Sequence, residues 1–157
     1  MTSMKRRIFL KGSLATGAVG IAVSTGLLAP RVSLAAWSKT AFDATDVDSA
    51  TTALYGSSGM DKSDKITIKA PDIAENGAVV PVTVTTSIDG ASSISILADK
   101  NATPLTAEFL LGPGAEGFVS TRIKMGKTAN VIAVVKAGDK LYSSSKEVKV
   151  TIGGCGG

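Results

Sequence analysis

The feature that most restricts the fold is an alternation of apolar and polar residues with a period of two, which begins at Lys65. Ile66 and Ile68, and later Val82 and Val84, alternate with threonine and lysine. Successive side chains of a β-strand point to opposite faces, so this pattern predicts half-buried strands. The predicted strands are residues 65–70, 78–86, 92–98, 105–111, 117–125, 130–137 and 140–151.

Turn-forming residues separate these segments, as at Asn76-Gly77 and Gly138-Asp139. Pro81 cannot donate a ladder hydrogen bond, so its strand is expected to be an edge or to contain a bulge there. The serines at 143–145 leave open whether the last strand is one piece or two.

A different pattern precedes the strands. Residues 40–55 predict one short helix that ends at Gly56, and residues 57–64 predict a polar loop. The apolar residues on one face of this helix are Phe42, Val47, Ala50 and Leu54.

About seven short strands joined by regular turns predict an all-β domain with a short N-terminal helix, an immunoglobulin-like antiparallel β-sandwich. The alternation also leaves valine and isoleucine for an outer sheet face, which a dedicated partner could cover. The predicted organisation is a leader at 1–35, a helix and loop at 36–64, the sandwich at 65–152 and a flexible C-terminal arm at 153–157.

Residues 1–35 are predicted to be an export signal rather than part of the fold. Arg6 and Arg7, followed by Ile-Phe-Leu-Lys, match the paired arginines of a twin-arginine signal. An uncharged stretch at 12–29 and small residues at 33–36 complete the pattern, with cleavage expected near the end of the leader. We therefore expect a periplasmic protein exported by the twin-arginine pathway.

A transmembrane anchor is the alternative for residues 12–29. This stretch is at the short limit of the ~20 apolar residues that a span requires. Four glycines dilute it and a cleavage site follows it, so we expect no stable membrane anchor.

Removal of the leader changes the charge balance. The whole chain has 17 Lys+Arg against 13 Asp+Glu, and five of the basic residues lie in the leader. The remaining 12 basic and 13 acidic residues give a formal charge near −1, so no basic patch indicates nucleic acid or an anionic membrane.

Two absences from the sequence restrict the chemistry. The chain has no histidine, which excludes Ser-His-Asp and Cys-His catalysis and histidine-ligated zinc or haem. It has one cysteine, so no internal disulfide forms, and one thiol is too few for a metal site.

That cysteine, Cys155, lies between glycines at the C-terminus. Glycine offers a strand no side chain to pack and loses the most backbone entropy on ordering, so the segment is expected to be a mobile arm. Cys155 lies three residues past Ile152, a reach of roughly 10 Å. An arm this narrow can enter a deep active site in another protein. The arm's four glycines are Gly153, Gly154, Gly156 and Gly157.

No acid, base or metal ligand lies next to the Cys155 thiol in the sequence, which favours a substrate carrier over an enzyme. Three alternatives remain for this cysteine. It could be a small buried residue, although its glycine neighbours have nothing to pack. It could link a structural periplasmic β-sandwich protein to another chain through an intermolecular disulfide. It could serve a thiol enzyme, although no resolving cysteine or neighbouring base is present.

The twin-arginine leader, short helix, β-rich domain and terminal Gly-Gly-Cys-Gly-Gly together resemble the SoxY subunit of the SoxYZ sulfur carrier. The resemblance implies a heterodimer with SoxZ, a smaller β-sandwich partner that is exported with SoxY. It implies that Cys155 is the covalent attachment point for sulfur intermediates and that the surrounding glycines form the arm. No cofactor other than this bound sulfur is implied.

The resemblance also implies a sequence of periplasmic enzymes that act on the arm. The c-type cytochrome enzyme SoxAX couples thiosulfate to the thiol and gives an S-sulfonate adduct. The hydrolase SoxB releases sulfate and leaves a persulfide, and in some organisms SoxCD oxidises the outer sulfur. The partner-binding surface, the participation of SoxCD and the final oxidation product are left open by the sequence.

Overall fold

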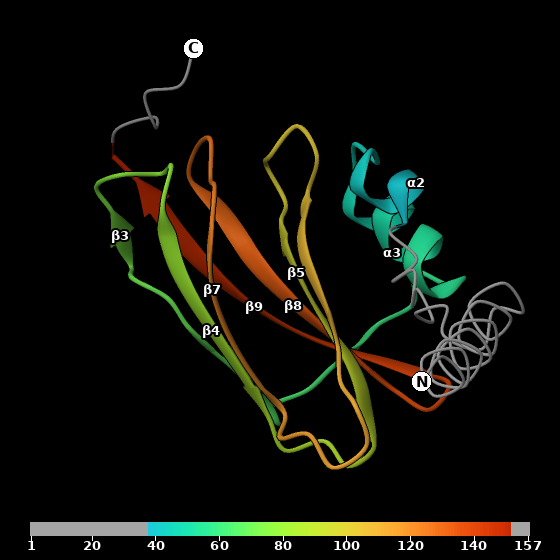
Figure 1. Cartoon of the computed structure of the whole chain (residues 1–157). Helices are drawn as coiled ribbons and strands as arrows, with labels where there is room; N and C mark the ends of the chain where they lie inside the picture. The colour runs from blue at the N-terminus through green and yellow to red at the C-terminus, as the bar shows by residue number, and fades with distance from the viewer. Residues whose placement is uncertain (1–37, 152–157) are drawn as a thin grey trace, which may run out of the picture. The chain divides into compact units, whose positions relative to one another are not determined.

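The computed structural model of the chain describes residues 38–151, in which two helices precede nine strands (Figure 1). The helices are α2 (Lys39–Phe42) and α3 (Val47–Tyr55). The strands are β1 (Asp61–Lys62), β2 (Ile66–Lys69), β3 (Ile73–Ala74), β4 (Val80–Thr86), β5 (Ala91–Ala98), β6 (Leu105–Leu110), β7 (Phe118–Ile123), β8 (Ala129–Ala137) and β9 (Lys140–Val150).

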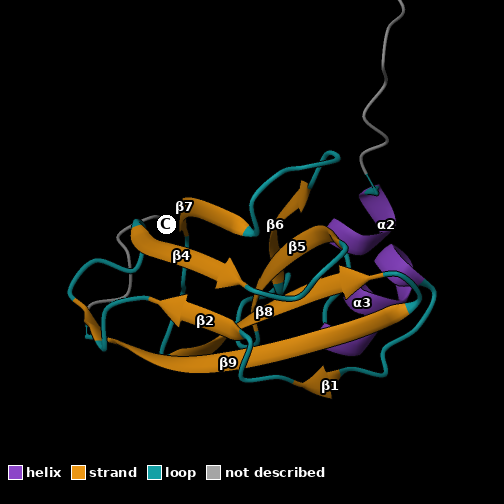
Figure 2. Ribbon diagram, turned by 90° about the horizontal axis from the view of Figure 1, so that it is seen from below, coloured by secondary structure: helices purple, strands orange, loops and turns teal. Residues whose placement is uncertain are grey.

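The strands form two sheets, which confirms the predicted β-sandwich (Figure 2). One sheet has the order β1-β9-β8-β5-β6, with β3 also on β9, and the other has the order β2-β4-β7. The long strands pair antiparallel, whereas β1 and β3 each add a two-residue parallel pairing to β9. All seven predicted strands occur. The sequence did not predict β1 and β3, because strands of two residues are too short to show an alternation of apolar and polar side chains.

The main core lies between the two sheets. Every second residue of β4 from Val80 to Thr86 is buried, as the period-two pattern requires. These side chains meet the inward residues of β5 and β8, among them Ile94, Ile96 and Val131, each with no exposed surface. Burying each such side chain contributes about 1.5–3 kcal/mol to folding.

Strands β5 and β8 are buried on their outer face as well. Leu97 and Val134 point away from the main core and form a second cluster with Ala41 of α2 and Ala50 of α3. The two helices therefore cover part of the outer sheet face that the alternation left for a partner (Figure 1). The sequence pattern shows that this face is apolar, but it does not show whether the same chain or another chain covers it.

The prediction of one helix over 40–55 was wrong, because the chain turns between α2 and α3. Asp46 has an extended backbone, and its carboxylate accepts a hydrogen bond from the Ser49 amide at 2.7 Å. Aspartate is a favoured N-cap, so its side chain begins a new helix here instead of continuing the first. The predicted end is confirmed: Gly56 is the C-cap, with a left-handed φ of 78°.

Pro81 lies where β4 has a neighbour on one side only. It pairs with Arg122 of β7, whereas β2 reaches β4 only from Thr83 to Thr86. The missing amide hydrogen of proline is tolerated at such an edge. The expectation of an edge strand was wrong for the strand as a whole, because β4 is the middle strand of its sheet, and the unpaired edge is confined to the part of β4 that β2 does not reach.

Helix α3 is fixed to β5 by a buried polar contact. The Tyr55 hydroxyl lies 2.5 Å from Ser95 Oγ and accepts a hydrogen bond from Ser93 Oγ at 3.1 Å. Burial raises the pKa of Tyr55, and it also raises the pKa of Glu108 on the adjacent strand β6. The Lys136 ammonium lies 5.8 Å from the centre of the Tyr55 ring.

We expect Tyr55→Phe to lower the free energy of unfolding by about 1–2 kcal/mol, because two buried serine hydroxyls lose this partner. Urea titration followed by circular dichroism measures the change. Tyr142→Phe is the matched control: Tyr142 is half-buried, and its hydroxyl has no hydrogen-bond partner among residues 38–151. Equal losses in the two variants would contradict the role given to the Tyr55 hydroxyl.

Candidate functional site

The predicted site residues lie outside the described part of the chain. These are Cys155, Gly153, Gly154, Gly156 and Gly157 of the arm, and Arg6 and Arg7 of the leader. The structure does describe the segment from which the arm departs, residues 149–151, which we call the arm root.

Backbone hydrogen bonds hold the arm root on both sides. On one side, the Lys149 amide donates to the Asp72 carbonyl at 3.0 Å and the Thr151 amide donates to the Ala74 carbonyl at 3.2 Å. On the other side, the Val150 amide donates to Thr128 Oγ1 at 3.0 Å. The chain is therefore fixed in place as far as Thr151.

A third segment packs against the arm root at Gly77. The Met125 amide donates to the Gly77 carbonyl at 2.7 Å. A Cβ atom on Gly77 would overlap the Met125 carbonyl oxygen and would lie 2.9 Å from Val150 Cγ1. The absence of a side chain at Gly77 thus allows the β3–β4 and β7–β8 connections to meet at the end of β9.

The arm root shows from which end of the sandwich the chain continues toward Cys155. Cys155 is four residues past Thr151, a span of about 13 Å at full extension. Three connections lie at this end of the sandwich: β3–β4, β5–β6 and β7–β8 (Figure 1).

A groove of about 620 Å³ lies between the β5–β6 and β7–β8 connections. Its lining includes Lys100, Arg122, Lys124 and Lys127, and it includes no acidic residue. We call it the basic groove. Sequence analysis missed it because Arg122, Lys124 and Lys127 are a short run in a nearly neutral domain, and only folding brings Lys100 beside them.

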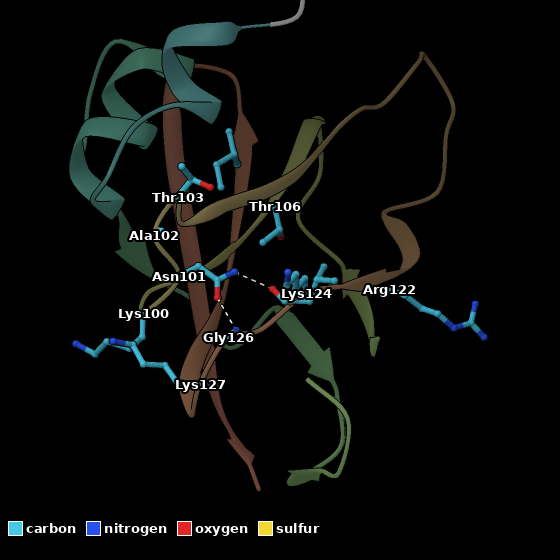
Figure 3. A pocket seen from close by; sticks show the side chains of 11 residues that line it. Lys100, Asn101, Ala102, Thr103, Thr106, Arg122, Lys124, Gly126 and Lys127 are labelled. Atoms are coloured by element: carbon cyan, nitrogen blue, oxygen red, sulfur yellow. Dashed lines mark hydrogen bonds between the residues drawn. The ribbon is translucent and has the colours of Figure 1, made fainter. Parts of the chain in front are cut away.

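Asn101 joins the two sides of the basic groove (Figure 3). Its amide Nδ2 donates to the Lys124 carbonyl at 2.7 Å, and its Oδ1 accepts from the Gly126 amide at 3.1 Å. One side chain therefore fixes both walls relative to each other. The buried Leu105 and Ile123 also belong to the lining.

Other kinds of site have less support in the described residues. Residues 38–151 contain no group of three or more histidine, cysteine, aspartate or glutamate side chains placed to hold a metal ion. In the same range, neither helix has the length and apolar character needed to cross a bilayer.

We expect Gly77→Ala to lower the free energy of unfolding by about 1–3 kcal/mol, because the new methyl group overpacks the contact between Met125 and Val150. Thermal unfolding provides the measurement, and loss of amide protection at Thr151 would locate the damage at the arm root. Gly59→Ala is the control, since its Cβ meets only Ser57 Oγ at an ordinary 3.6 Å. Equal stability of the two variants would argue against a tight contact at Gly77.

Comparison with known proteins gives the family. The profile described as "Sulfur oxidation protein SoxY" matches residues 51–155, so its last matched residue is Cys155. Comparison with curated proteins finds no match. A solved structure, that of the sulfur carrier protein SoxY from Chlorobium limicola f thiosulfatophilum, is 51% identical, with a TM-score of 0.63. The alignment covers 68% of this chain and 97% of that one. The chain therefore belongs to the SoxY family of sulfur oxidation proteins.

Proposed function

We propose that the protein carries sulfur intermediates covalently on Cys155 and presents them to separate periplasmic enzymes. The observation that carries this proposal is the family match, which extends through the sandwich and ends at the one cysteine of the chain. The solved relative is itself named a sulfur carrier protein. The fixed arm root supports the same role, because it gives the predicted arm a defined starting point.

In the proposed loading step, thiosulfate is joined to the Cys155 thiol. The product is Cys–S–S–SO3⁻, and the new sulfur–sulfur bond releases one proton and two electrons. A c-type cytochrome enzyme of the SoxAX kind accepts the electrons. The thiolate is the reactive form of cysteine, and no group beside it in the sequence lowers its pKa, so activation is assigned to the receiving enzyme.

The proposed release step is hydrolysis by an enzyme of the SoxB kind. Water attacks the terminal sulfur, sulfate leaves, and Cys–S–S⁻ and two protons remain. A SoxCD-type dehydrogenase would then oxidise the outer sulfur in organisms that have one. In each step the protein supplies the attachment point and the partner enzyme supplies the catalytic groups.

A single cysteine suits this cargo. Adducts bound through a sulfur–sulfur bond are cleaved by attacking thiolates. Because the chain has one cysteine, a loaded molecule contains no second thiol of its own that could attack the adduct.

The proposal includes a partner and a compartment. We propose that the chain pairs with a SoxZ-type β-sandwich and that the pair reaches the periplasm as folded cargo of the twin-arginine pathway. Arg6 and Arg7 support this route.

We expect native protein from cells growing on thiosulfate to carry sulfur or sulfonate mass on its C-terminal peptide. Cys155→Ser should lack the adduct and abolish thiosulfate oxidation, while circular dichroism stays unchanged. Intact-mass and peptide-mass analysis provide the readout. A disulfide-linked second chain with no small adduct would favour the structural alternative, and normal thiosulfate oxidation by the serine variant would refute the carrier role.

We expect replacement of both Arg6 and Arg7 by lysine to retain the precursor in the cytoplasm, because the paired arginines are the recognised element of the signal. Cell fractionation and immunoblotting measure the distribution. Arg31→Lys, which makes the same replacement in the leader but outside the arginine pair, is the control. Normal periplasmic levels of the Arg6→Lys, Arg7→Lys variant would refute the assigned route.

A further inference from the structure

The cations of the basic groove have no ion-pair partners in the described part of the chain. The two ion pairs found among residues 38–151 are Lys39–Asp43 and Lys146–Asp72, and neither involves the groove. The acid that precedes Lys100, Asp99, is engaged by Asn130, whose backbone and side-chain nitrogens donate to its two carboxylate oxygens at 2.9 Å each. Like charges on one concave surface repel each other, so a bound anion would lower the electrostatic free energy.

The groove presents its cations in a defined direction. Figure 3 shows the side chains of Lys100 and Lys127 extending to the same side of the groove, whereas Arg122 extends to the other side. The Asn101 hydrogen bonds hold the connections that carry the two lysines. Two ammonium groups on a fixed backbone suit an oxyanion, which can accept hydrogen bonds from both.

The groove adjoins the arm root. Lys127 immediately precedes Thr128, whose hydroxyl accepts the hydrogen bond from the Val150 amide at 3.0 Å. From Thr151, four extended residues reach about 13 Å, and the cysteine side chain with its adduct extends farther. A short tether also raises the local concentration of its cargo to the millimolar range, at which even a weak site is occupied.

We propose that the basic groove binds the sulfonate group of the adduct carried on Cys155 of the same chain. This inference rests on the proposed function, and it adds a docked state to the carrier cycle. The sulfonate Cys–S–S–SO3⁻ bears the oxyanion that the lysines would bind. The free thiol is neutral, and the persulfide Cys–S–S⁻ has its charge on one sulfur with no oxygen atoms that could accept hydrogen bonds from both lysines, so hydrolytic loss of sulfate weakens docking and releases the arm.

The docked state would also protect the cargo. An adduct held against the sandwich is less accessible to thiols in solution than one at the end of a free arm. The receiving enzyme would have to displace the sulfonate from the lysines.

The test uses the mature full-length protein as purified from its host. Tetrathionate loads it without an enzyme: the thiol attacks one inner sulfur, Cys–S–S–SO3⁻ forms, and thiosulfate and a proton leave. We expect loading to shift the amide resonances of Asn101, Gly126 and Lys127 in ¹H–¹⁵N spectra. Sodium sulfate should reverse the shifts by competition more strongly than sodium chloride at equal ionic strength.

Two matched variants distinguish binding in the groove from a general effect of positive charge on the protein. Lys100→Ala with Lys127→Ala should weaken docking by about tenfold, since each exposed ion pair contributes a factor of about five or less. Lys65→Ala with Lys140→Ala removes the same charge from exposed positions outside the groove and should leave the shifts intact. The groove variant should also lose its adduct faster to dithiothreitol than the control variant.

Each result supports or overturns the inference. It is overturned if loading produces no shift at the groove, or if the shift survives removal of Lys100 and Lys127. It is also overturned if free thiosulfate shifts the groove resonances of a Cys155→Ser protein while loading of the native thiol does not. The intact mass of the same samples shows whether the adduct is present. An adduct that does not dock refutes sulfonate binding in the groove and leaves the carrier role standing. Failure of native material to carry any adduct refutes the carrier role.

Discussion

The pairing of β9 along both of its edges is the constraint on which the rest of the structure depends. β8 pairs with β9 from Lys140 to Val148 on one side, and the short strands β1 and β3 occupy the other side toward its two ends. A strand that ends in a run of glycines has no side chains to stop fraying from progressing inward. The hydrogen bonds at Asp72, Ala74 and Thr128 supply that stop, and they convert the last described residues into a fixed base for whatever follows.

The same sheet supports two different surfaces. Its outer face over β5 and β8 is covered by α2 and α3, and the Tyr55 contact with two buried serines fixes the position of α3. The end of the sandwich near the arm root carries three connections and the basic groove instead. The helices therefore pack against one face of the sheet, while four cations lie together at the end that carries the arm root.

Several expectations from the sequence were met because they depend on local chemistry. Period two located the seven main strands, and Gly56 ended α3 because glycine accepts a left-handed conformation there. The prediction of a single helix over 40–55 was wrong because the Asp46 carboxylate accepts the hydrogen bond of the Ser49 amide and so begins a second helix. The last strand is continuous through its serines, because β8 pairs with it residue by residue and needs no apolar side chain there to do so.

The sequence by itself determined the chemistry of this protein: one thiol, no histidine, and glycines around Cys155 are properties of composition and order that do not depend on the fold. It also determined the fold class, because alternation reports which side of each strand is buried. Only the tertiary structure decided which end of the sandwich carries the arm root and which charges surround it. Those facts depend on contacts between segments far apart in the chain, such as Asn101 with Lys124 and Gly77 with Met125, and no local pattern encodes a long-range contact.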